Sequence, residues 1–400
     1  MTEPTTPPVT PVAAAPATDA AGDVVLSPLH AEHEALGATM TPFAGWLMPL
    51  RYAGDLAEHQ AVRTAAGLFD LSHMGELHVD GPGAGAGLDR ALVGNISGLA
   101  VGRARYTMIV AEDGGILDDL IVYRLADASF LVVANAANVA VVRDALAERL
   151  AGADASLTDR TLETALVAVQ GPRAVEVVTG LVADPDEAAA VRDVRYYAAV
   201  RATVGGVPAL VARTGYTGED GFELFVPADA APGLWRDLLE AGRPVGLVPA
   251  GLSARDSLRL EAGMPLYGNE LDRTTAPHDA GLGRVVRLDK TTPDGEPLPF
   301  VGREALAARA HATPSRVLVG LVGLGRRAAR HGHEVLTGTG ADAATVGRVT
   351  SGAPSPTLGT PIAMAYVTPE VSAPGTELAV DVRGRREPVR VVELPFYRRS

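Results

Sequence analysis

The stretch 114–124 constrains the fold of this chain most, because it places two adjacent carboxylates inside a run of strand-forming residues. Asp113-Gly114-Gly115 has the composition of a hairpin turn, and the β-branched and aromatic residues that follow predict a strand from about Ile116. Successive side chains of a strand point to opposite faces, so one of Asp118 and Asp119 faces inward if one side of the sheet is covered. A carboxylate in that position needs a hydrogen-bond partner, a counter-ion or a catalytic task. A solvated strand end beside the turn is the alternative that the pattern leaves open.

The composition is that of a globular chain and limits its partners. The 400 residues suggest two or three domains, with 47% hydrophobic and 21% charged residues. The formal net charge of −13 argues against a nucleic acid or an anionic membrane surface as partner, since both need a basic footprint. The absence of cysteine excludes disulfides and thiolate metal sites. We find no signal peptide, transit peptide or membrane span, and we expect a cytoplasmic protein.

The amino-terminal region divides into a tail and the start of the fold. Residues 1–25 are rich in Pro, Thr and Ala, so they bury too little apolar surface to order, and we expect a disordered tail. Ser27 is expected to cap a helix that ends at Gly37. A second helix is expected from Asp55 to Gly67, followed by a strand at 76–79.

Two motifs in the next part of the chain suggest a metal or a cofactor, and neither is complete. His73 and His78 are five apart without a third ligand nearby, so we expect no metal site. The letters of 81–87 match a dinucleotide phosphate loop, but the acidic residue expected about twenty positions further on is missing. A strand, Gly-Pro and helix pattern recurs at 165–172, so a proline at a helix start explains both.

A glycine-rich turn between two strands at 209–226 contains a second candidate carboxylate. Tyr216 in the turn offers a face for stacking, and the glycines allow close approach of a ligand. Glu223 shares one face of the second strand with Phe225, while the intervening apolar residues share the other. This pattern indicates a buried acceptor for the N–H edge of a heterocycle, or else a solvent-facing carboxylate on an edge strand.

Residues 252–263 predict an amphipathic helix with two arginines on one face. Arg255 and Arg259 lie four positions apart, and Asp256 and Glu261 are close enough in sequence to neutralise them. The alternative is that the arginines bind a ligand carboxylate.

The last quarter of the chain predicts a small all-β domain. Residues 291–299 are rich in Pro and Gly and are expected to be a linker. Evenly spaced short strands follow. They are expected at 317–323, 344–350, 361–367, 377–382 and 389–394.

Taken together, the motifs resemble those of the glycine cleavage T-protein family of tetrahydrofolate-dependent aminomethyltransferases. The segments that carry the resemblance are 43–49, 67–74, 114–123, 214–221, 254–263 and 350–356. They stand in the order of the family and span about 27–397. Only the tail before Ser27 departs from the pattern.

The resemblance implies an α+β fold, arranged as a three-domain ring around a central folate cavity, with a C-terminal β-barrel-like domain. Residues 26–75 and 160–290 would form a first, discontinuous folate-binding domain. Residues 76–159 would form a second α+β domain that carries the catalytic Asp, and 291–400 the barrel-like domain.

The resemblance also implies the chemistry and its residues. Asp119 would be catalytic, Glu223 would hold the pterin edge and Arg255 the polar part of the folate. The further walls of the pocket would be Met74, Asn135 and Tyr216. The reaction would take an aminomethyl group from the lipoyl arm of the H protein, release ammonia and form 5,10-methylenetetrahydrofolate, with tetrahydrofolate as one-carbon acceptor and no metal.

Three other functions compete with this one. The folate domains of sarcosine and dimethylglycine oxidising enzymes carry a flavin domain, for which this chain has no room. The iron–sulfur-assembly paralogue resembles a Lys-Gly-Cys-Tyr-x-Gly-Gln-Glu pattern, whereas 213–220 reads Arg-Thr-Gly-Tyr-Thr-Gly-Glu-Asp. A dinucleotide oxidoreductase would rest on residues 81–87 alone.

Overall fold

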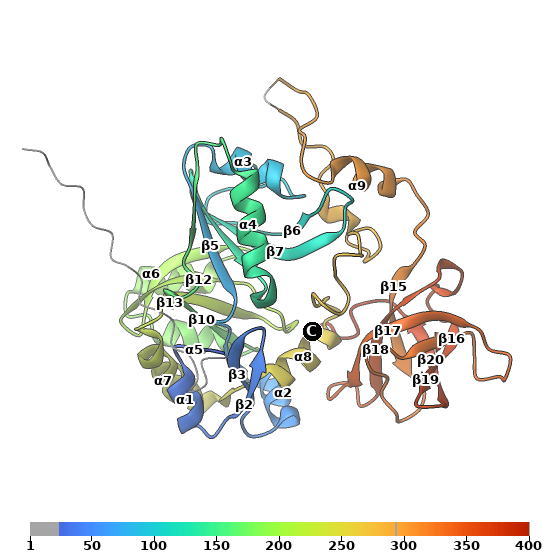
Figure 1. Ribbon diagram of the computed structural model, residues 1–400. Coiled ribbons are helices and arrows are strands. Elements are labelled where there is room, and N and C mark those ends of the chain that lie inside the picture. The colour runs from blue at the N-terminus through green and yellow to red at the C-terminus, as the bar shows by residue number, and fades with distance from the viewer. Residues whose placement is uncertain (1–23, 293, 400) are drawn as a thin grey trace, which may run out of the picture.

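The protein is represented by a computed structural model that describes residues 24–292 and 294–399. Figure 1 shows three parts: two bodies of mixed helices and strands, and a barrel at the right. The tail predicted for 1–25 lies outside the described residues as far as 23, and Val25–Leu26 already forms the short strand β1. The α+β class, the three-part arrangement and the C-terminal barrel are confirmed.

A five-stranded antiparallel sheet forms the upper body in Figure 1. Its strand order is β6-β7-β8-β5-β9, with β6 at one edge beside β7. The bounds are β5 Gly75–Asp80, β6 Ala104–Val110, β7 Ile116–Ala126, β8 Ser129–Ala134 and β9 Ser156–Asp159. Helices α3 (Ala84–Ala91) and α4 (Val139–Arg149) pack on one face. The predicted turn at 113–115 and the strand from Ile116 are therefore confirmed.

A six-stranded sheet of order β11-β12-β13-β10-β4-β14 forms the second body. The bounds are β4 Ala66–Asp70, β10 Thr164–Gln170, β11 Ala199–Val204, β12 Val207–Ala212, β13 Gly221–Pro227 and β14 Leu247–Pro249. Helices α5 (Ala174–Gly180), α6 (Pro185–Asp193) and α7 (Ala231–Gly242) supply buried side chains to the core on its outer face. Because β13 lies between β12 and β10, Glu223 stands on an interior strand and not on an edge.

The inner faces of the two sheets share one apolar core. Alternate residues of β7 divide between two cores: Leu120 packs under α3 and α4, whereas Tyr123 packs against Phe225 on β13. The period of two that defines a strand therefore sends Asp118 toward the helices and Asp119 toward the second sheet. Both faces of this sheet are covered, so neither carboxylate stands at a solvated strand end.

The first helices are shorter than the sequence predicts. Helix α1 (His30–Ala35) begins after Leu29, and Ser27 Oγ accepts from the Leu29 N–H and donates to Asp70. Helix α2 (Asp55–Thr64) ends before Gly67, which lies in β4. Pairing of β4 with both β10 and β14 outweighs the helical pattern there, and a Cβ added at Gly67 would collide with Val62.

The amino-terminal strands and helix α8 complete the second body. Strands β1, β2 (Thr39–Phe43) and β3 (Trp46–Arg51) form a three-stranded sheet in the order β1-β3-β2. Helix α8 (Leu252–Glu261) is confirmed at its predicted place and contacts α2, β3 and the barrel. The C-terminal segment returns to this helix, since the Tyr397 N–H donates a hydrogen bond of 2.8 Å to the Glu261 carbonyl.

The C-terminal barrel closes through six strands in the order β15-β18-β17-β16-β19-β20. The bounds are β15 Val317–Gly323, β16 Glu334–Leu336, β17 Thr345–Pro354, β18 Pro361–Val367, β19 Glu377–Val382 and β20 Arg385–Val392, and α9 (Arg303–Ala310) precedes them. The sequence predicted five of these strands and missed β16. That strand has only three residues, and its pairing with β17 and β19 closes the barrel.

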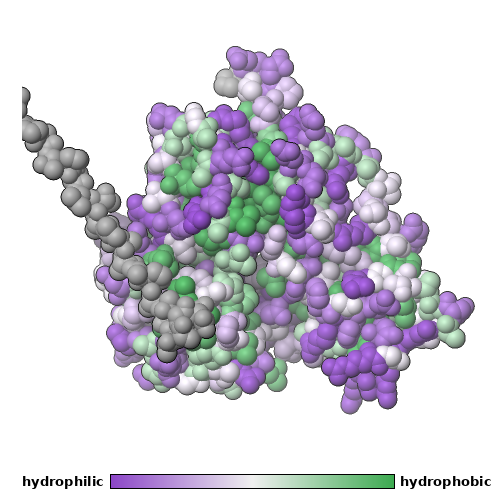
Figure 2. Space-filling view, in the orientation of Figure 1, coloured by the Kyte–Doolittle hydropathy of each residue, from purple (hydrophilic) through white to green (hydrophobic). Residues whose placement is uncertain are grey.

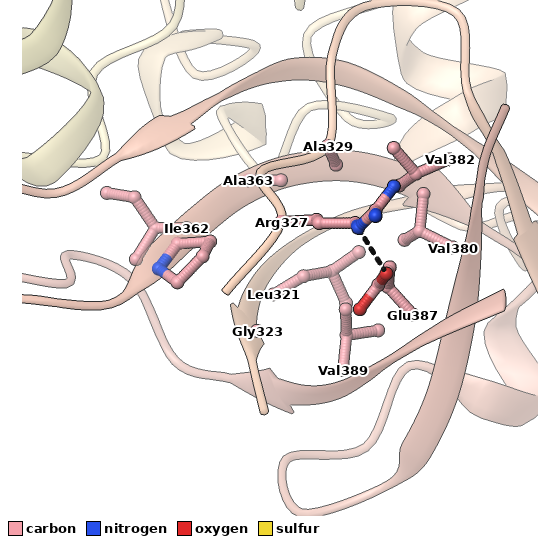
Figure 3. A pocket seen from close by; sticks show the side chains of 11 residues that line it. Leu321, Gly323, Arg327, Ala329, Ile362, Ala363, Val380, Val382, Glu387 and Val389 are labelled. Atoms are coloured by element: carbon pink, nitrogen blue, oxygen red, sulfur yellow. Dashed lines mark ion pairs between the residues drawn. The ribbon is translucent and has the colours of Figure 1, made fainter. Parts of the chain in front are cut away.

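The cavity drawn in Figure 3 lies inside the barrel and is too small for a cofactor. Apolar side chains such as Leu321 and Val380 line it, and an ion pair of Arg327 with Glu387 (3.3 Å) lies at its edge. Its free volume is about 10 Å³, close to the minimum that holds one water molecule. The barrel is therefore a packed core and not a ligand container.

The surface in Figure 2 is largely hydrophilic over the barrel, and apolar residues gather over the part that carries α3 and α4. Val141 on α4 is an exposed apolar side chain of that part. No helix in the described ranges is long and apolar enough to cross a membrane.

Candidate active site

The two aspartates of β7 have different surroundings. Asp118 is fully buried and accepts from the Asn135 N–H (2.9 Å) and from the Asn138 side-chain amide (2.6 Å). Asp119 is partly exposed, and its Oδ2 accepts from the Tyr106 hydroxyl at 3.0 Å. Asp119 is therefore the carboxylate that a ligand between the sheets can reach.

Asn135 joins the two carboxylates. Its Nδ2 donates to Asp118 Oδ1 (2.9 Å) and to Asp119 Oδ1 (2.8 Å). Asn135 follows β8 directly and precedes a short 3₁₀ turn at Ala136–Asn138, so the strand end and the turn both hold its backbone. The role of Asn135 as a pocket wall stays a prediction, but its hydrogen bonds hold the Asp119 carboxylate in one orientation.

Burial controls the charge of the aspartate pair. Desolvation raises the pKa of Asp118, and the neighbouring charge of Asp119 raises it further. Desolvation also raises the pKa of Asp119, while hydrogen bonds from Tyr106 and Asn135 lower it. The carboxylate of Asp119 thus has a pKa above the usual range of Asp, and two donors hold it in one orientation.

Glu223 is buried on the inner face of β13, with 8% of its surface exposed. Its Oε2 accepts from the Thr214 hydroxyl and, at 3.5 Å, from the Tyr123 hydroxyl. Its Oε1 makes no hydrogen bond with any residue that the structure describes, so one oxygen remains for a ligand. Burial raises the pKa of Glu223, and the Thr214 hydrogen bond and the charge of Arg255 oppose that rise. The expected burial of this carboxylate is confirmed, the solvent-facing alternative on an edge strand is wrong, and the contact with a heterocycle stays a prediction.

Arg255 and Tyr216 form the polar and aromatic part of the site. The Arg255 guanidinium lies over the Tyr216 ring, 4.8 Å from its centroid. The Tyr216 hydroxyl donates to the Pro265 carbonyl, which fixes the ring. Within the described ranges Arg255 makes no hydrogen bond or ion pair, although burial lowers its pKa. Arg255 is a partly buried cation that feels the charge of Glu223 but makes no ion pair, so it is a candidate receptor for a ligand carboxylate.

Arg259 has a different task from Arg255, four residues earlier. It is 1% exposed and pairs with Asp256 (2.7 Å) and Glu270 (2.9 Å). Its Nη2 also donates to Ser351 Oγ in the barrel at 2.8 Å. The neutralisation expected from the sequence thus holds for Arg259 and Asp256, whereas Arg255 stays unpaired.

Met74 and Asn135 stand at the same end of the pair β5 and β8. Met74 precedes Gly75 and Asn135 follows Ala134, and Gly75 pairs with Ala134. Met74 packs against the core between the sheets, as a pocket wall would. His73 next to it is buried, its Nδ1 has no partner, and burial lowers its pKa to about 4, so it is neutral at physiological pH.

The structure adds residues that the sequence did not single out. Tyr106 reaches Asp119 diagonally across β6 and β7, and Thr214 and Tyr123 hold Glu223. Tyr197 has a left-handed backbone (φ 56°), an unusual conformation for an aromatic residue. Burial raises its pKa, and the charges of Glu223 and Asp119 raise it further, so it lies within electrostatic reach of both carboxylates. The strand alternation of 104–110 could have pointed to Tyr106, but no local pattern indicates Tyr197.

Metal ligands do not gather at this site. Among residues 24–292 and 294–399 no group of three His, Asp or Glu side chains is arranged to hold a metal ion. His73 lies in the turn before β5, whereas His78 lies within that strand.

Comparison with known proteins covers nearly the whole chain. The family model described as the GCVT N-terminal domain matches residues 29–290, and that of the glycine cleavage T-protein C-terminal barrel domain matches 316–398. The aminomethyltransferase of Streptomyces coelicolor is 60% identical over 377 residues, which cover 93% of this chain and 97% of that protein. That of Moorella thermoacetica is 45% identical over 377 residues, covering 94% and 99%.

A solved structure agrees with this match. The glycine cleavage system aminomethyltransferase T from Bartonella henselae superposes with a TM-score of 0.82 at 36% identity, covering 94% of this chain and 98% of that one. The two facing sheets, the closed barrel and the polar site between the sheets thus define the fold class of the aminomethyltransferases. The chain belongs to the glycine cleavage T-protein family.

Proposed function

We propose that Asp119, Glu223 and Arg255 form the active site through which this protein acts as the aminomethyltransferase of the glycine cleavage system. It takes the aminomethyl group from the lipoyl arm of the H protein, releases ammonia and forms 5,10-methylenetetrahydrofolate. The observation that carries the proposal is Asp119 itself, a partly exposed carboxylate held by Tyr106 and Asn135 on the face of β7 that looks toward Glu223 and Arg255.

The residues present fit tetrahydrofolate. Glu223 keeps one oxygen free for the N–H edge of a pterin, and Thr214 and Tyr123 hold the other. Arg255 offers an unpaired guanidinium for a carboxylate or amide of the folate, beside the Tyr216 ring. Met74 and Asn135 would line the pocket between them.

The chemistry needs a fixed negative charge. Loss of one heteroatom from the aminomethyl carbon leaves that carbon with iminium character. A carboxylate oriented in advance stabilises the developing positive charge without reorganising at the moment of reaction. Asp119 can also accept the proton that the attacking folate amine gives up, because burial raises its pKa toward the working pH. Tetrahydrofolate carries the carbon away, while the protein aligns the reactants and excludes water.

The first experiment is ammonia release from aminomethylated H protein, with and without tetrahydrofolate, for wild type and Asp119→Asn. We expect folate-dependent release that falls by about 10²-fold or more in the variant, while folate affinity changes little. Asp118→Asn is the matched control and should lose less, since Asp118 faces α4 and not the ligand. Equal turnover of wild type and Asp119→Asn would contradict the proposal. Folate binding without any release from wild type would favour a folate-binding accessory protein.

Glu223→Ala tests the pterin contact separately. Removing a buried charged acceptor should weaken tetrahydrofolate binding by about ten- to a hundredfold, measured by titration calorimetry. Glu112→Ala, at an exposed position of the turn before β7, should bind like wild type. Unchanged affinity of Glu223→Ala would refute this role.

The domain division, the partners and the location remain proposals. We keep 26–75 with 160–290, 76–159 and 291–400 as domains because the separate sheets follow these divisions closely. The lipoylated H protein is the expected protein partner, and family membership supports it. A cytoplasmic location stays a prediction of the sequence analysis.

A further inference from the structure

Lys290 is the one lysine among the 35 Lys and Arg residues of this chain. It is not a surface residue, since only 4% of it is exposed. Arginine is the default basic residue of this sequence, and a buried lysine therefore points to a task that a guanidinium performs poorly.

The ammonium of Lys290 occupies a cradle of three carbonyl oxygens. Its Nζ donates to the carbonyls of Asp89, Leu92 (2.7 Å) and Gly94 (3.1 Å), at the C-terminal end of α3 and in the turn that follows. The Phe300 ring covers it, with the centroid 4.1 Å from Nζ. An ammonium has three N–H donors on one atom, which match three converging acceptors, whereas the planar fork of Arg spreads its donors apart. The negative end of the α3 dipole also favours a cation here.

The turn bound by Lys290 also covers the free edge of the five-stranded sheet. The Val93 N–H donates to the Met108 carbonyl (3.1 Å), and the Gly94 N–H donates to Thr107 Oγ1 (3.0 Å). Strand β6, which contains both acceptors, is one of the two edge strands of this sheet. The fit is tight, because a Cβ added at Gly94 would lie 2.7 Å from Thr107 Oγ1.

The residue of β6 that comes before Thr107 contacts the active site. Tyr106 precedes Thr107, and its hydroxyl donates to Asp119 at 3.0 Å. We propose that Lys290 is a positioning residue for the aminomethyl transfer: its ammonium fixes the turn 92–95 on β6, and β6 thereby holds the Tyr106 hydroxyl on Asp119. This inference rests on the role proposed above for Asp119.

The pKa of Lys290 determines the pH range in which the test is run. Burial lowers the pKa of Lys290 to about 8, Arg303 lowers it, and Asp89 and Asp289 raise it. Below about pH 7 the ammonium is therefore charged and the cradle is filled. The groups that act on Asp119 are Tyr106, Asn135 and Asp118, together with the more distant Tyr197 and Tyr216.

The experiment measures the pH dependence of kcat/KM below pH 7 for wild type, Lys290→Met, Lys290→Arg, Tyr106→Phe and the Lys290→Met/Tyr106→Phe double variant. The Tyr106 hydrogen bond lowers the pKa of Asp119, so its loss should move the acid limb up by about one pH unit. We expect this shift in Lys290→Met and in Tyr106→Phe, and no additional shift in the double variant. Lys290→Arg should behave like Lys290→Met, although it keeps the charge.

Controls separate positioning from stability and from the proposed function. Leu306→Ala opens the apolar core at the same junction without touching the cradle, so it should lower Tm and leave the acid limb in place. A shifted limb in Tyr106→Phe with an unshifted one in Lys290→Met would overturn the role of Lys290 alone. An unshifted limb in Tyr106→Phe would instead count against Asp119 as the titrating group, and with it against the inference.

A measurement on the wild-type protein tests the burial of Lys290 even if the variants fail to fold. Because Lys290 is the one side-chain amine, acetic anhydride labelling followed by mass spectrometry reports on it without ambiguity. Lys290 should stay unmodified in the native protein and react after unfolding in urea. Rapid modification of Lys290 in the native protein would show that the cradle does not exist.

Discussion

At the scale of the residue, Asp118 and Asp119 are adjacent in one strand but have different surroundings. Asp118 accepts from three amide donors beneath α4, whereas the Asp119 carboxylate accepts from the Tyr106 and Asn135 side chains and is partly exposed. The sequence placed both in a strand and required one to face inward, but it did not say which. That choice depended on the resemblance to the family and on where the second sheet lies.

The charge of Asp119 leads to a pH prediction for the wild-type protein. A carboxyl whose pKa is raised by burial is protonated at a higher pH than an exposed one, and only its ionised form stabilises positive charge. As pH falls through this raised pKa, kcat/KM should decline, and the acid limb should lie above the ordinary range of Asp, about 3.9. A pH profile that stays flat down to about pH 4 would show that no such carboxylate takes part.

At the scale of the element, strand β5 contains a buried acid, Glu76. It is fully buried, and neither of its carboxyl oxygens makes a hydrogen bond with any residue of 24–292 or 294–399. Burial raises its pKa well above the usual 4.5, and the charge of Asp159 raises it further. In β5, Leu77 points toward α3 and α4, and Glu76 points toward the other sheet. The sequence of the strand therefore looks amphipathic. The second sheet nevertheless covers its polar side as well.

Glu76→Met should therefore stabilise the protein. A group with a raised folded pKa favours the native state below its unfolded pKa, and this contribution is lost as pH rises through the folded value. Replacing the unpaired carboxyl by an apolar side chain of similar length should gain about 1–3 kcal/mol at neutral pH. Thermal unfolding at pH 5 and pH 8 checks this, with the larger gain expected at pH 8. A lower Tm at both values would mean that Glu76 has a partner.

At the scale of the whole molecule, buried ions in the last turn of α8 attach the barrel to the body. Arg259 joins Glu270 to Ser351 of the barrel, and Glu261 accepts from Arg63 (2.8 Å) and from the barrel hydroxyl of Thr357 (2.7 Å). These residues are far apart in the chain, so they assemble only when the three parts meet around α8 (Figure 1).

Two arginine variants on the same helix separate attachment from ligand binding. Arg259→Met leaves Glu270 as a buried charge without its counter-ion and should cost about 3–5 kcal/mol of stability. Arg255→Met removes a cation that makes no ion pair within the described ranges and acts on Glu223 only through its charge, so Tm should change less than in Arg259→Met while folate affinity falls. Differential scanning calorimetry and a folate titration on both variants check this. A similar loss of Tm in the two variants would contradict the distinction.

The sequence by itself determined the local elements and the residues able to do chemistry. The period of two placed Asp119 and Glu223 in strands, the apolar stripe placed Arg255 and Arg259 on one helix, and regular spacing indicated five strands of the barrel. Tertiary structure alone decided where helix α2 gives way to β4, that the three residues of β16 close the barrel, which arginine is free, and why Lys290 is buried. The physical reason is that backbone periodicity is a local property, whereas the partner that neutralises a buried charge or pairs a short strand comes from a distant part of the chain.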